Sequence, residues 1–153
     1  MFVDELKSTP TKKLITNRSF VYRGATIGET VQKMVSENVG VIAILDPETQ
    51  QFLGLFTKRH LLRRAILQQR GKNEPIDSIF TPNPLALHDT ETLERAFVLM
   101  YKYDYKYLPV IDEKYFFHGF ITAEDFLKFL EELFPEAIGN VLPRNKFTTL
   151  DAG

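Results

Sequence analysis

The fold of this chain is decided by a stretch of sequence that occurs twice. Residues 41–60 read VIAILDPETQQFLGLFTKRH, and residues 107–125 read YLPVIDEKYFFHGFITAED. Each copy contains an apolar run, a polar turn, a second apolar run that ends in threonine, and the start of a charged segment. Self-similarity at a fixed spacing indicates a repeated structural unit.

The repeat extends upstream of these stretches and keeps its spacing. A shift of 66 residues places Thr26 on Thr92, and after one residue is lost in the polar turn a shift of 65 places Gly54 on Gly119. The apolar positions match nearly throughout, although identity between the copies is low. We therefore expect two copies of one structural unit.

Each copy predicts a strand, a helix, two paired strands and a closing helix. Apolar residues at helical spacing follow Thr26 and Thr92, and nearly continuous apolar runs typical of buried strands come next. This order is that of an α/β (α+β) fold. A unit of about 60 residues buries little apolar surface alone, so we expect the two copies to pack through their small sheets in a pseudo-two-fold arrangement. The expected strands are 41–45, 52–57, 108–111 and 116–122, and the expected closing helices are 60–69 and 123–134.

The expected domain organisation follows from the repeat. We place the first repeat at residues 8–73 and the second at residues 74–134. Residues 1–7 then form an N-terminal lead-in. Residues 135–153 contain Pro, Gly and a polar end, and we expect a tail there.

Composition is that of a soluble globular domain. Of the 153 residues, 44% are apolar and 25% are charged, and no cysteine is present. The lack of cysteine excludes disulfides, thiolate metal sites and cysteine nucleophiles. Because the chain has no apolar run of about 18 residues and no apolar segment at its start, we expect no membrane span, no secretory signal and a cytoplasmic location.

The net charge of −1 hides an asymmetry between the two halves. Residues 1–73 contain 12 Lys/Arg and 6 Asp/Glu, a net of +6, whereas residues 74–153 contain 7 Lys/Arg and 14 Asp/Glu, a net of −7. Such an asymmetry bears on association and on ligand fields rather than on the fold.

The ordered set of motifs resembles a tandem pair of CBS domains, the arrangement called a Bateman module. The resemblance covers about residues 8–134. In the second repeat it rests on the segments IFTPNP (79–84), TLERA (92–96), YLPVID (107–112) and GFITAED (119–125). In the first repeat it rests on NVG (38–40) and GLFTKRH (54–60). No single segment is specific, but their order, repeated at constant spacing, is.

The resemblance implies a regulatory binding module rather than an enzyme. Members of the family bind adenosine-containing ligands (AMP, ADP, ATP or S-adenosylmethionine) in clefts between the paired repeats. We expect no obligatory cofactor, with such a ligand acting as a regulatory signal. By the same resemblance, Asp125 would take the ribose hydroxyls and Thr122 would lie near the phosphate. The segments flanking the base would be the strand with Tyr107, Leu108 and Pro109 and the loop with Thr81, Asn83 and Leu85.

The chemistry of Asp125 agrees with a ribose contact, since a carboxylate can accept two neighbouring hydroxyl protons. A phosphate would be favoured at the helix N-terminus, with Thr122 as an added donor. Thr122 and Asp125 also fit a capping box, with Thr at the N-cap and Asp three residues later. The two roles can coexist in ligand-free and ligand-bound forms.

The first repeat departs from the family pattern because His60 replaces the aspartate. An imidazole can meet one ribose hydroxyl but cannot accept from two, so the equivalent ribose site is in doubt. Lys58 and Arg59 precede His60, and two more arginines follow it. This cluster either favours an anion such as a phosphate tail or is a solvated basic helix face. We therefore expect one competent adenosyl site, at the second repeat.

The sequence contains no catalytic signature. It has no glycine-rich phosphate loop, no nucleophile elbow and no metal-ligand spacing among its three histidines. The run YKYDYKY (101–107) is similar to an aromatic and basic nucleic-acid binder, but its tyrosines are better explained as the end of a helix and the start of a core strand. The acidic second half also argues against nucleic acid.

Surplus apolar helix faces in both repeats predict self-association. A two-fold homodimer is the commonest solution, and the charge asymmetry favours a head-to-tail arrangement. We expect signalling to an unknown effector protein and no membrane partner. The alternative is a structural dimerisation module whose ligand sites are vestigial.

Overall fold

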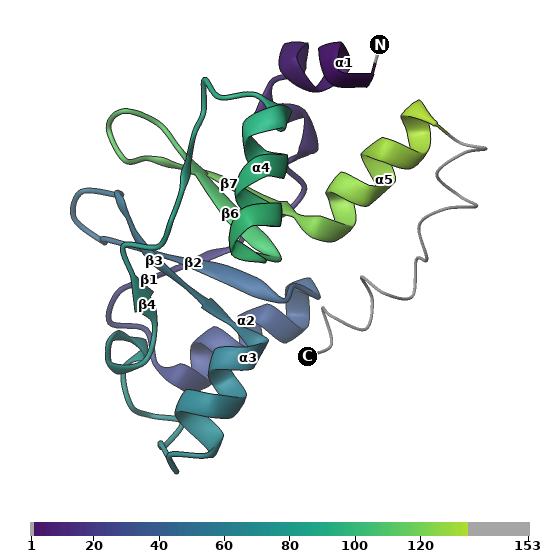
Figure 1. Cartoon of the computed structure of the whole chain (residues 1–153). Helices are drawn as coiled ribbons and strands as arrows, with labels where there is room; N and C mark the ends of the chain where they lie inside the picture. The colour runs from purple at the N-terminus through teal and green to yellow at the C-terminus, as the bar shows by residue number, and fades with distance from the viewer. Residues whose placement is uncertain (1, 135–153) are drawn as a thin grey trace. The chain divides into compact units, whose positions relative to one another are not determined.

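The computed structural model describes residues 2–134 of the chain (Figure 1). The described residues form two small sheets and several helices, which is the mixed α/β class that the sequence predicts. The expected tail, residues 135–153, lies outside the described residues.

The first repeat alternates strands and helices in the predicted order. Its closing helix begins two residues before the predicted start at residue 60, because Thr57 caps it. From Leu61 this helix changes to a wider hydrogen-bond pattern, in which Leu67 N–H donates to Leu62 C=O at 3.0 Å. The elements are β1 (Phe20–Tyr22), α2 (Ile27–Glu37), β2 (Val41–Leu45), β3 (Phe52–Thr57), α3 (Lys58–His60) and the π-helical segment η2 (Leu61–Ile66).

The second repeat reproduces the first at the predicted spacing. Helices α2 and α4 begin and end 66 residues apart, and strands β3 and β7 do so 65 residues apart. Helices α2 and α4 also end alike, at Asn38 and Asp104, whose φ angles are 53° and 55°. The elements are β5 (Leu87–His88), α4 (Leu93–Tyr103), β6 (Tyr107–Ile111), β7 (Phe117–Thr122) and α5 (Ala123–Leu133).

Each repeat has its own sheet. The first sheet has the order β1-β2-β3-β4, with β1 parallel to β2 and the remaining pairs antiparallel. The second has the order β5-β6-β7, with β5 parallel to β6. All five residues of β2 are buried, which explains why its sequence is a continuous apolar run.

Short elements precede the strand that opens each repeat, β1 in the first and β5 in the second, and the segment before a repeat is the segment before that strand. Helix α1 (Phe2–Ser8) and the 3-10 helix η1 (Thr11–Leu14) come before the first repeat. The 3-10 helix η3 (Ile76–Ser78) and strand β4 (Thr81–Pro82) come before the second.

The chain divides into two compact units that are not continuous in sequence. Among the described residues, the first-repeat unit contains residues 17–85 and 113–117, and the second-repeat unit contains residues 2–16, 86–112 and 118–134. The segment before each repeat therefore belongs to the unit of the other repeat. Strand β4, for example, pairs with β3 of the first repeat. The sequence boundaries at residues 8–73 and 74–134 stay predictions.

Gly54 in β3 is required by the close approach of β4. A Cβ atom at this position would lie 2.1 Å from the carbonyl oxygen of Thr81 and 2.7 Å from the ring of Phe80. We expect Gly54→Ala to lower the free energy of unfolding by about 1–3 kcal/mol, as overpacking does, in chemical denaturation. Gly71→Ala is the matched control, because the nearest atom to its Cβ would be 3.8 Å away. Equal stability of the two variants would contradict the close contact between β3 and β4.

Candidate functional site

Thr122 caps α5, but its pairing with Asp125 differs from the capping box that the sequence predicts, because the Asp125 carboxylate accepts from the Thr122 hydroxyl instead of the Thr122 N–H. The Asp125 N–H donates to Thr122 Oγ1 at 3.0 Å, and the Thr122 hydroxyl donates to Asp125 Oδ2 at 2.9 Å. These bonds fix the carboxylate against the first turn of the helix. The Thr122 hydroxyl would have to rotate away from Asp125 to donate to a phosphate.

A second hydroxyl reaches the same carboxylate from a distant part of the sequence. Thr16 Oγ1 donates to Asp125 Oδ2 at 2.6 Å, across a separation of 109 residues. An ionised carboxylate offers about four lone-pair positions, so two threonine hydroxyls leave it able to accept from a ribose. Sequence analysis missed Thr16, because nothing near that residue marks it as a partner of α5.

The first repeat forms a full capping box, in which an imidazole takes the place of the carboxylate. Thr57 Oγ1 accepts from the His60 N–H at 3.2 Å, and His60 Nδ1 accepts from the Thr57 N–H at 3.2 Å. Because Nδ1 acts as the acceptor, the proton of the neutral ring lies on Nε2. His60 can therefore donate one hydrogen bond to a ligand and has no acceptor left for ribose hydroxyls.

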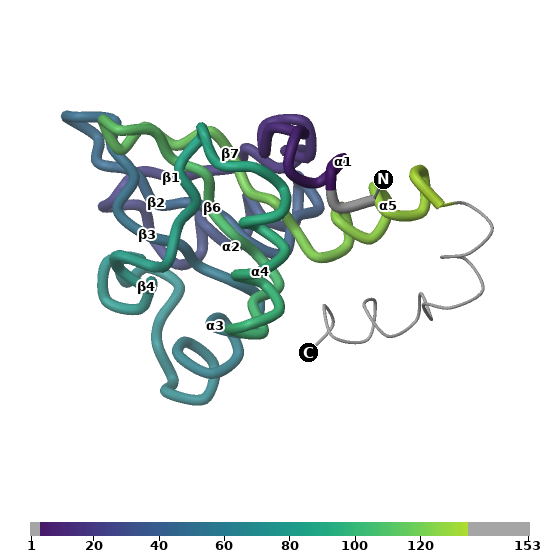
Figure 2. The backbone as a smooth tube through the Cα atoms, turned by 45° about the horizontal axis from the view of Figure 1, so that its top comes forward, coloured from purple at the N-terminus to yellow at the C-terminus, as the bar shows by residue number. Residues whose placement is uncertain are grey.

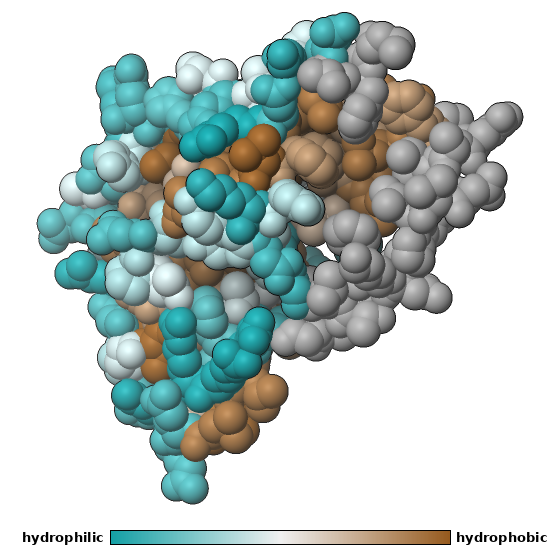
Figure 3. Space-filling view, in the orientation of Figure 1, coloured by the Kyte–Doolittle hydropathy of each residue, from teal (hydrophilic) through white to brown (hydrophobic). Residues whose placement is uncertain are grey.

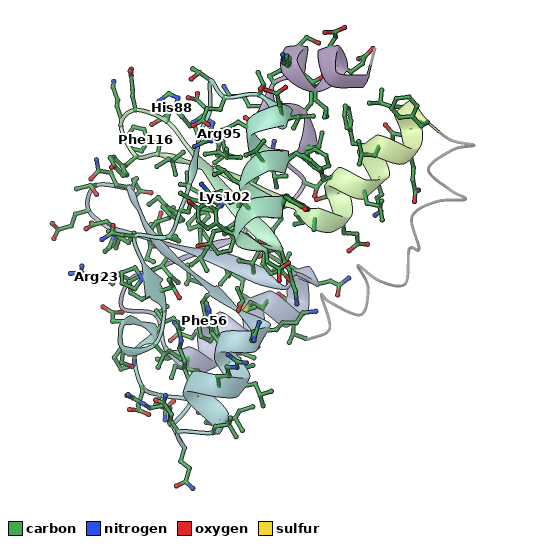
Figure 4. All side chains as sticks on the ribbon, in the orientation of Figure 1. Arg23, Phe56, His88, Arg95, Lys102 and Phe116 are labelled. Atoms are coloured by element: carbon green, nitrogen blue, oxygen red, sulfur yellow. The ribbon has the colours of Figure 1, made fainter. Side chains whose placement is uncertain are left out.

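The surroundings of His60 keep its ring neutral. Burial, followed by the charges of Arg64, Arg59 and Arg63, lowers the pKa of His60 from 6.5 to about 4. The ring also lies over Phe56, with 5.9 Å between ring centroids, and Figure 4 labels this phenylalanine within the first-repeat unit. A neutral imidazole surrounded by cations is consistent with its role as an acceptor in the cap.

The basic residues around His60 divide into two groups. Arg64 is half-buried and its Nη1 donates to the Ile79 carbonyl oxygen at 2.9 Å and to Thr81 Oγ1 at 2.8 Å. Arg64 thus binds the segment that leads into β4. Lys58 and Arg59, by contrast, are exposed in the first turn of the closing helix, and so can meet a ligand.

The two helix starts differ in charge. The first turn of α5 carries Glu124 and Asp125, whereas α3 carries no acidic residue in its first turn. Since the N-terminus of a helix favours negative charge, two carboxylates already satisfy α5, while α3 combines its dipole with cations. The start of α5 is suited to hydroxyl donors and the start of α3 to an anion.

The predicted site residues fall into two groups by compact unit. Thr81, Asn83 and Leu85 belong to the first-repeat unit, together with Lys58, Arg59 and His60. Tyr107, Leu108 and Pro109 belong to the second-repeat unit, together with Thr122 and Asp125. The loop that was expected to flank the base beside Asp125 is thus joined by hydrogen bonds to the repeat that carries His60.

The segments expected to flank the base are held in different ways. Leu108 is fully buried in the core, so its side chain packs and only its backbone is available to a ligand. Tyr107 is half-buried. Asn83 has a φ of 47°, in the left-handed region that asparagine tolerates, and its N–H donates to the Leu53 carbonyl oxygen at 3.0 Å.

The remaining histidines pair with carboxylates. His118 Nε2 lies 3.0 Å from Asp112 Oδ2, and His88 Nδ1 lies 3.1 Å from Asp89 Oδ1. Within residues 2–134, no group of three His, Asp or Glu residues could hold a metal ion. No helix in that part of the chain is long and apolar enough to cross a membrane.

The sequence model of the CBS domain matches residues 3–66 and 76–132, and the chain therefore belongs to the CBS domain family. The chain is 32% identical over 106 residues to the uncharacterised protein MJ1225 of Methanocaldococcus jannaschii. That match covers 69% of this chain but only 37% of the relative, so the chain spans little more than a third of its length.

Two solved structures show the same fold. The CBS domain protein PAE2072 from Pyrobaculum aerophilum, complexed with AMP, is similar with a TM-score of 0.69 at 19% identity, covering 76% of this chain and 88% of that one. The CBS domain pair of protein MJ0100, in complex with 5′-methylthioadenosine and S-adenosyl-L-methionine, has a TM-score of 0.71 at 21% identity, covering 82% and 98%. CBS domain pairs are generally regulatory modules rather than catalysts.

The lowered pKa of His60 predicts a pH dependence of stability. Because the folded pKa of about 4 lies below the ordinary 6.5, neutral His60 stabilises the fold above pH 6.5, and this contribution is lost as the pH falls toward 4. We expect NMR titration of the His60 ring, assigned with His60→Asn, to give a midpoint near 4. A midpoint near 6.5 would contradict the half-buried, cation-flanked ring.

Proposed function

We propose that this chain is a non-catalytic regulatory module that binds an adenosyl ligand through Asp125 of its second repeat. The observation that carries the proposal is the Asp125 carboxylate, which two threonine hydroxyls orient at the start of α5. A fixed carboxylate suits a ribose, because its cis-diol donates two adjacent hydrogen bonds. The AMP and S-adenosylmethionine complexes of similar CBS proteins support this ligand class.

The first repeat has a different role in the proposal. Its His60 lacks the acceptors that a ribose requires, while Lys58 and Arg59 offer exposed cations beside a helix N-terminus. We assign an accessory anion contact, such as a phosphate group, to this end of α3. The ligand is AMP, ADP, ATP or S-adenosylmethionine, and it acts as a signal rather than as an obligatory cofactor.

We expect the module to pass its signal to an effector protein. We place the module in the cytoplasm and expect it to bind neither membranes nor nucleic acid.

An isosteric change at Asp125 tests the proposed ligand contact. Asp125→Asn keeps a side-chain oxygen for the cap but removes the charge, so we expect the affinity for the adenosyl ligand to fall about 10- to 100-fold. His60→Ala is the control and should bind the ligand normally. The measurement is thermal unfolding with AMP, ADP, ATP, S-adenosylmethionine, NAD and GTP, each at about 1 mM, followed by calorimetric titration of the ligand that stabilises the wild type.

The outcomes of this titration separate the two candidate functions. Loss of binding in His60→Ala with normal binding in Asp125→Asn would overturn the assignment of the ribose contact. If no panel member shifts nucleotide-free wild-type protein, the adenosyl proposal fails and the chain is better described as a structural dimerisation module with vestigial ligand sites.

A specific surface feature favours dimerisation in either case. Figure 3 shows an apolar patch over α3 and the segment that follows it. Its members are Leu62 and Ile66 on η2 and Leu67 directly after it, and they are 53%, 60% and 70% exposed. Such exposure is unusual for large apolar side chains grouped together. Helix α4 of the second repeat also exposes Phe97, Val98 and Tyr101. We propose a homodimer that covers these faces, with the head-to-tail arrangement favoured by the charge asymmetry.

A charged residue within the patch tests the dimer. We expect Ile66→Asp to halve the mass measured by light scattering during size-exclusion chromatography, because a carboxylate cannot be buried in an apolar interface without a partner. Val35→Asp is the matched control, since Val35 is 74% exposed on α2 outside the patch. A monomeric wild type, or an Ile66→Asp variant that stays dimeric, would contradict this interface.

A further inference from the structure

The segment before the first repeat is docked on the second repeat. This N-terminal arm (residues 2–16) buries Leu6, Leu14 and Ile15 in the same core as Leu93 and Leu130. Figure 2 shows its helix α1 beside α4, and the two helices are in contact. The arm is therefore part of the core of the second-repeat unit.

Polar contacts follow the arm along its length. The Leu93 N–H donates to the Thr9 carbonyl oxygen at 3.2 Å. Lys12 Nζ lies 3.6 Å from Asp89 Oδ2, and a looser pair joins Lys7 to Glu94 at 3.9 Å. A basic arm on an acidic repeat is electrostatically matched, although each exposed pair contributes little by itself.

The arm ends on the carboxylate that carries the proposed function. Thr16 is the last arm residue, and its hydroxyl donates to Asp125 Oδ2 at 2.6 Å. The other hydroxyl on this oxygen belongs to Thr122, at 2.9 Å. Thr122 belongs to the same helix cap, so Thr16 is the contact that connects Asp125 to a separate segment of the chain.

We propose that docking of the N-terminal arm and binding of the adenosyl ligand at Asp125 are coupled through Thr16. Thr16 is a positioning residue, because it fixes the carboxylate that meets the ribose. The coupling rests on the proposed function of Asp125. Coupling between two binding equilibria is reciprocal, so the ligand stabilises the docked arm as much as the docked arm strengthens ligand binding.

The first repeat lacks this connection. The backbone bonds that dock the two segments, Leu93 N–H to Thr9 C=O and Ile27 N–H to Glu74 C=O, show an offset of 65 between the segments. This offset places Thr16 on Thr81, whose hydroxyl oxygen accepts from Arg64 Nη1 instead of meeting a carboxylate. The corresponding acceptor is His60, whose Nδ1 is already occupied by the Thr57 N–H. The segment before the second repeat is held instead by Arg64, through Thr81. The coupling is therefore specific to the second repeat.

Calorimetric titration of full-length variants tests the coupling. We expect Thr16→Val to weaken binding of the adenosyl ligand selected on the wild type by about tenfold, and Thr16→Ser to restore it. Thr9→Val is the matched control, because the Thr9 hydroxyl donates to the Glu5 carbonyl oxygen within the arm, at 2.6 Å, and does not contact Asp125. Its affinity should equal that of the wild type.

Amide hydrogen exchange of the arm gives a second readout. A purely local role of Thr16 would leave the effect of ligand on this exchange the same in the wild type and in Thr16→Val. Ligand should slow exchange at residues 9–16 of the wild type and leave exchange in Thr16→Val unchanged. Without ligand, Asp125→Asn should already speed exchange in the arm, since the bond from Thr16 loses a charged acceptor.

Charge reversal at Lys12 tests the coupling at an arm residue away from Asp125. Lys12→Asp places two carboxylates together at Asp89, so we expect ligand affinity to fall about two- to fivefold. Lys12→Asp combined with Asp89→Lys should recover the wild-type affinity. Circular dichroism confirms that each variant is folded before it is titrated.

The possible failures are distinguishable. If the wild type binds and Thr16→Val binds equally well, the coupling is overturned while the proposed function stands. If Lys12→Asp speeds amide exchange in the arm but leaves ligand affinity unchanged, docking of the arm is not coupled to the ligand site. If the wild type binds no adenosyl ligand on the panel, the proposed function fails and the coupling fails with it.

Discussion

The candidate site depends on a threonine cap at the point where a strand becomes a helix. In each repeat a threonine ends the second paired strand, and its hydroxyl oxygen accepts from the N–H three residues later. The side chain of that later residue accepts in return, His60 from the Thr57 N–H and Asp125 from the Thr122 hydroxyl. This cap satisfies backbone donors that would otherwise be unpaired in the first turn. It also fixes the side chain at the third helical position, which is the position where the proposed ligand chemistry takes place.

The same position of the cap therefore carries side chains with two different hydrogen-bonding capacities. Asp125 takes its place in the cap and still has acceptor capacity, because a carboxylate has two oxygens. His60 takes the same place but uses its one acceptor nitrogen, and burial and nearby arginines keep its pKa low enough for that nitrogen to remain unprotonated. In the proposed function, the imidazole therefore keeps the cap and leaves no acceptor for a diol. The exposed cations beside His60 suit an anion, which needs donors rather than acceptors.

Much of this arrangement could be predicted from the sequence, because it is local. The apolar runs fix the strands, the helical spacing fixes α2 and α4, and the Thr-x-x-Asp pattern fixes the cap at Thr122. The contacts that define the site's surroundings could not be predicted, since they join residues far apart in sequence. Thr16 meets Asp125 across 109 residues, and Arg64 meets Thr81 from a helix whose π-helical form is not marked in the sequence.

The charge asymmetry of the chain also bears on which segment docks on which repeat within a single molecule. Position 23 of the first repeat corresponds to position 89 of the second, and the two carry opposite charges, Arg23 and Asp89. Arg23 pairs with Asp77 of the segment before the second repeat at 3.5 Å, whereas Asp89 pairs with Lys12 of the N-terminal arm at 3.6 Å. Exchange of the two segments would bring Lys12 to Arg23 and Asp77 to Asp89, with repulsion at both positions. Two repeats with the same backbone therefore distinguish their docking segments by charge, and the segment selected for the second repeat is the one that ends in Thr16, the partner of Asp125.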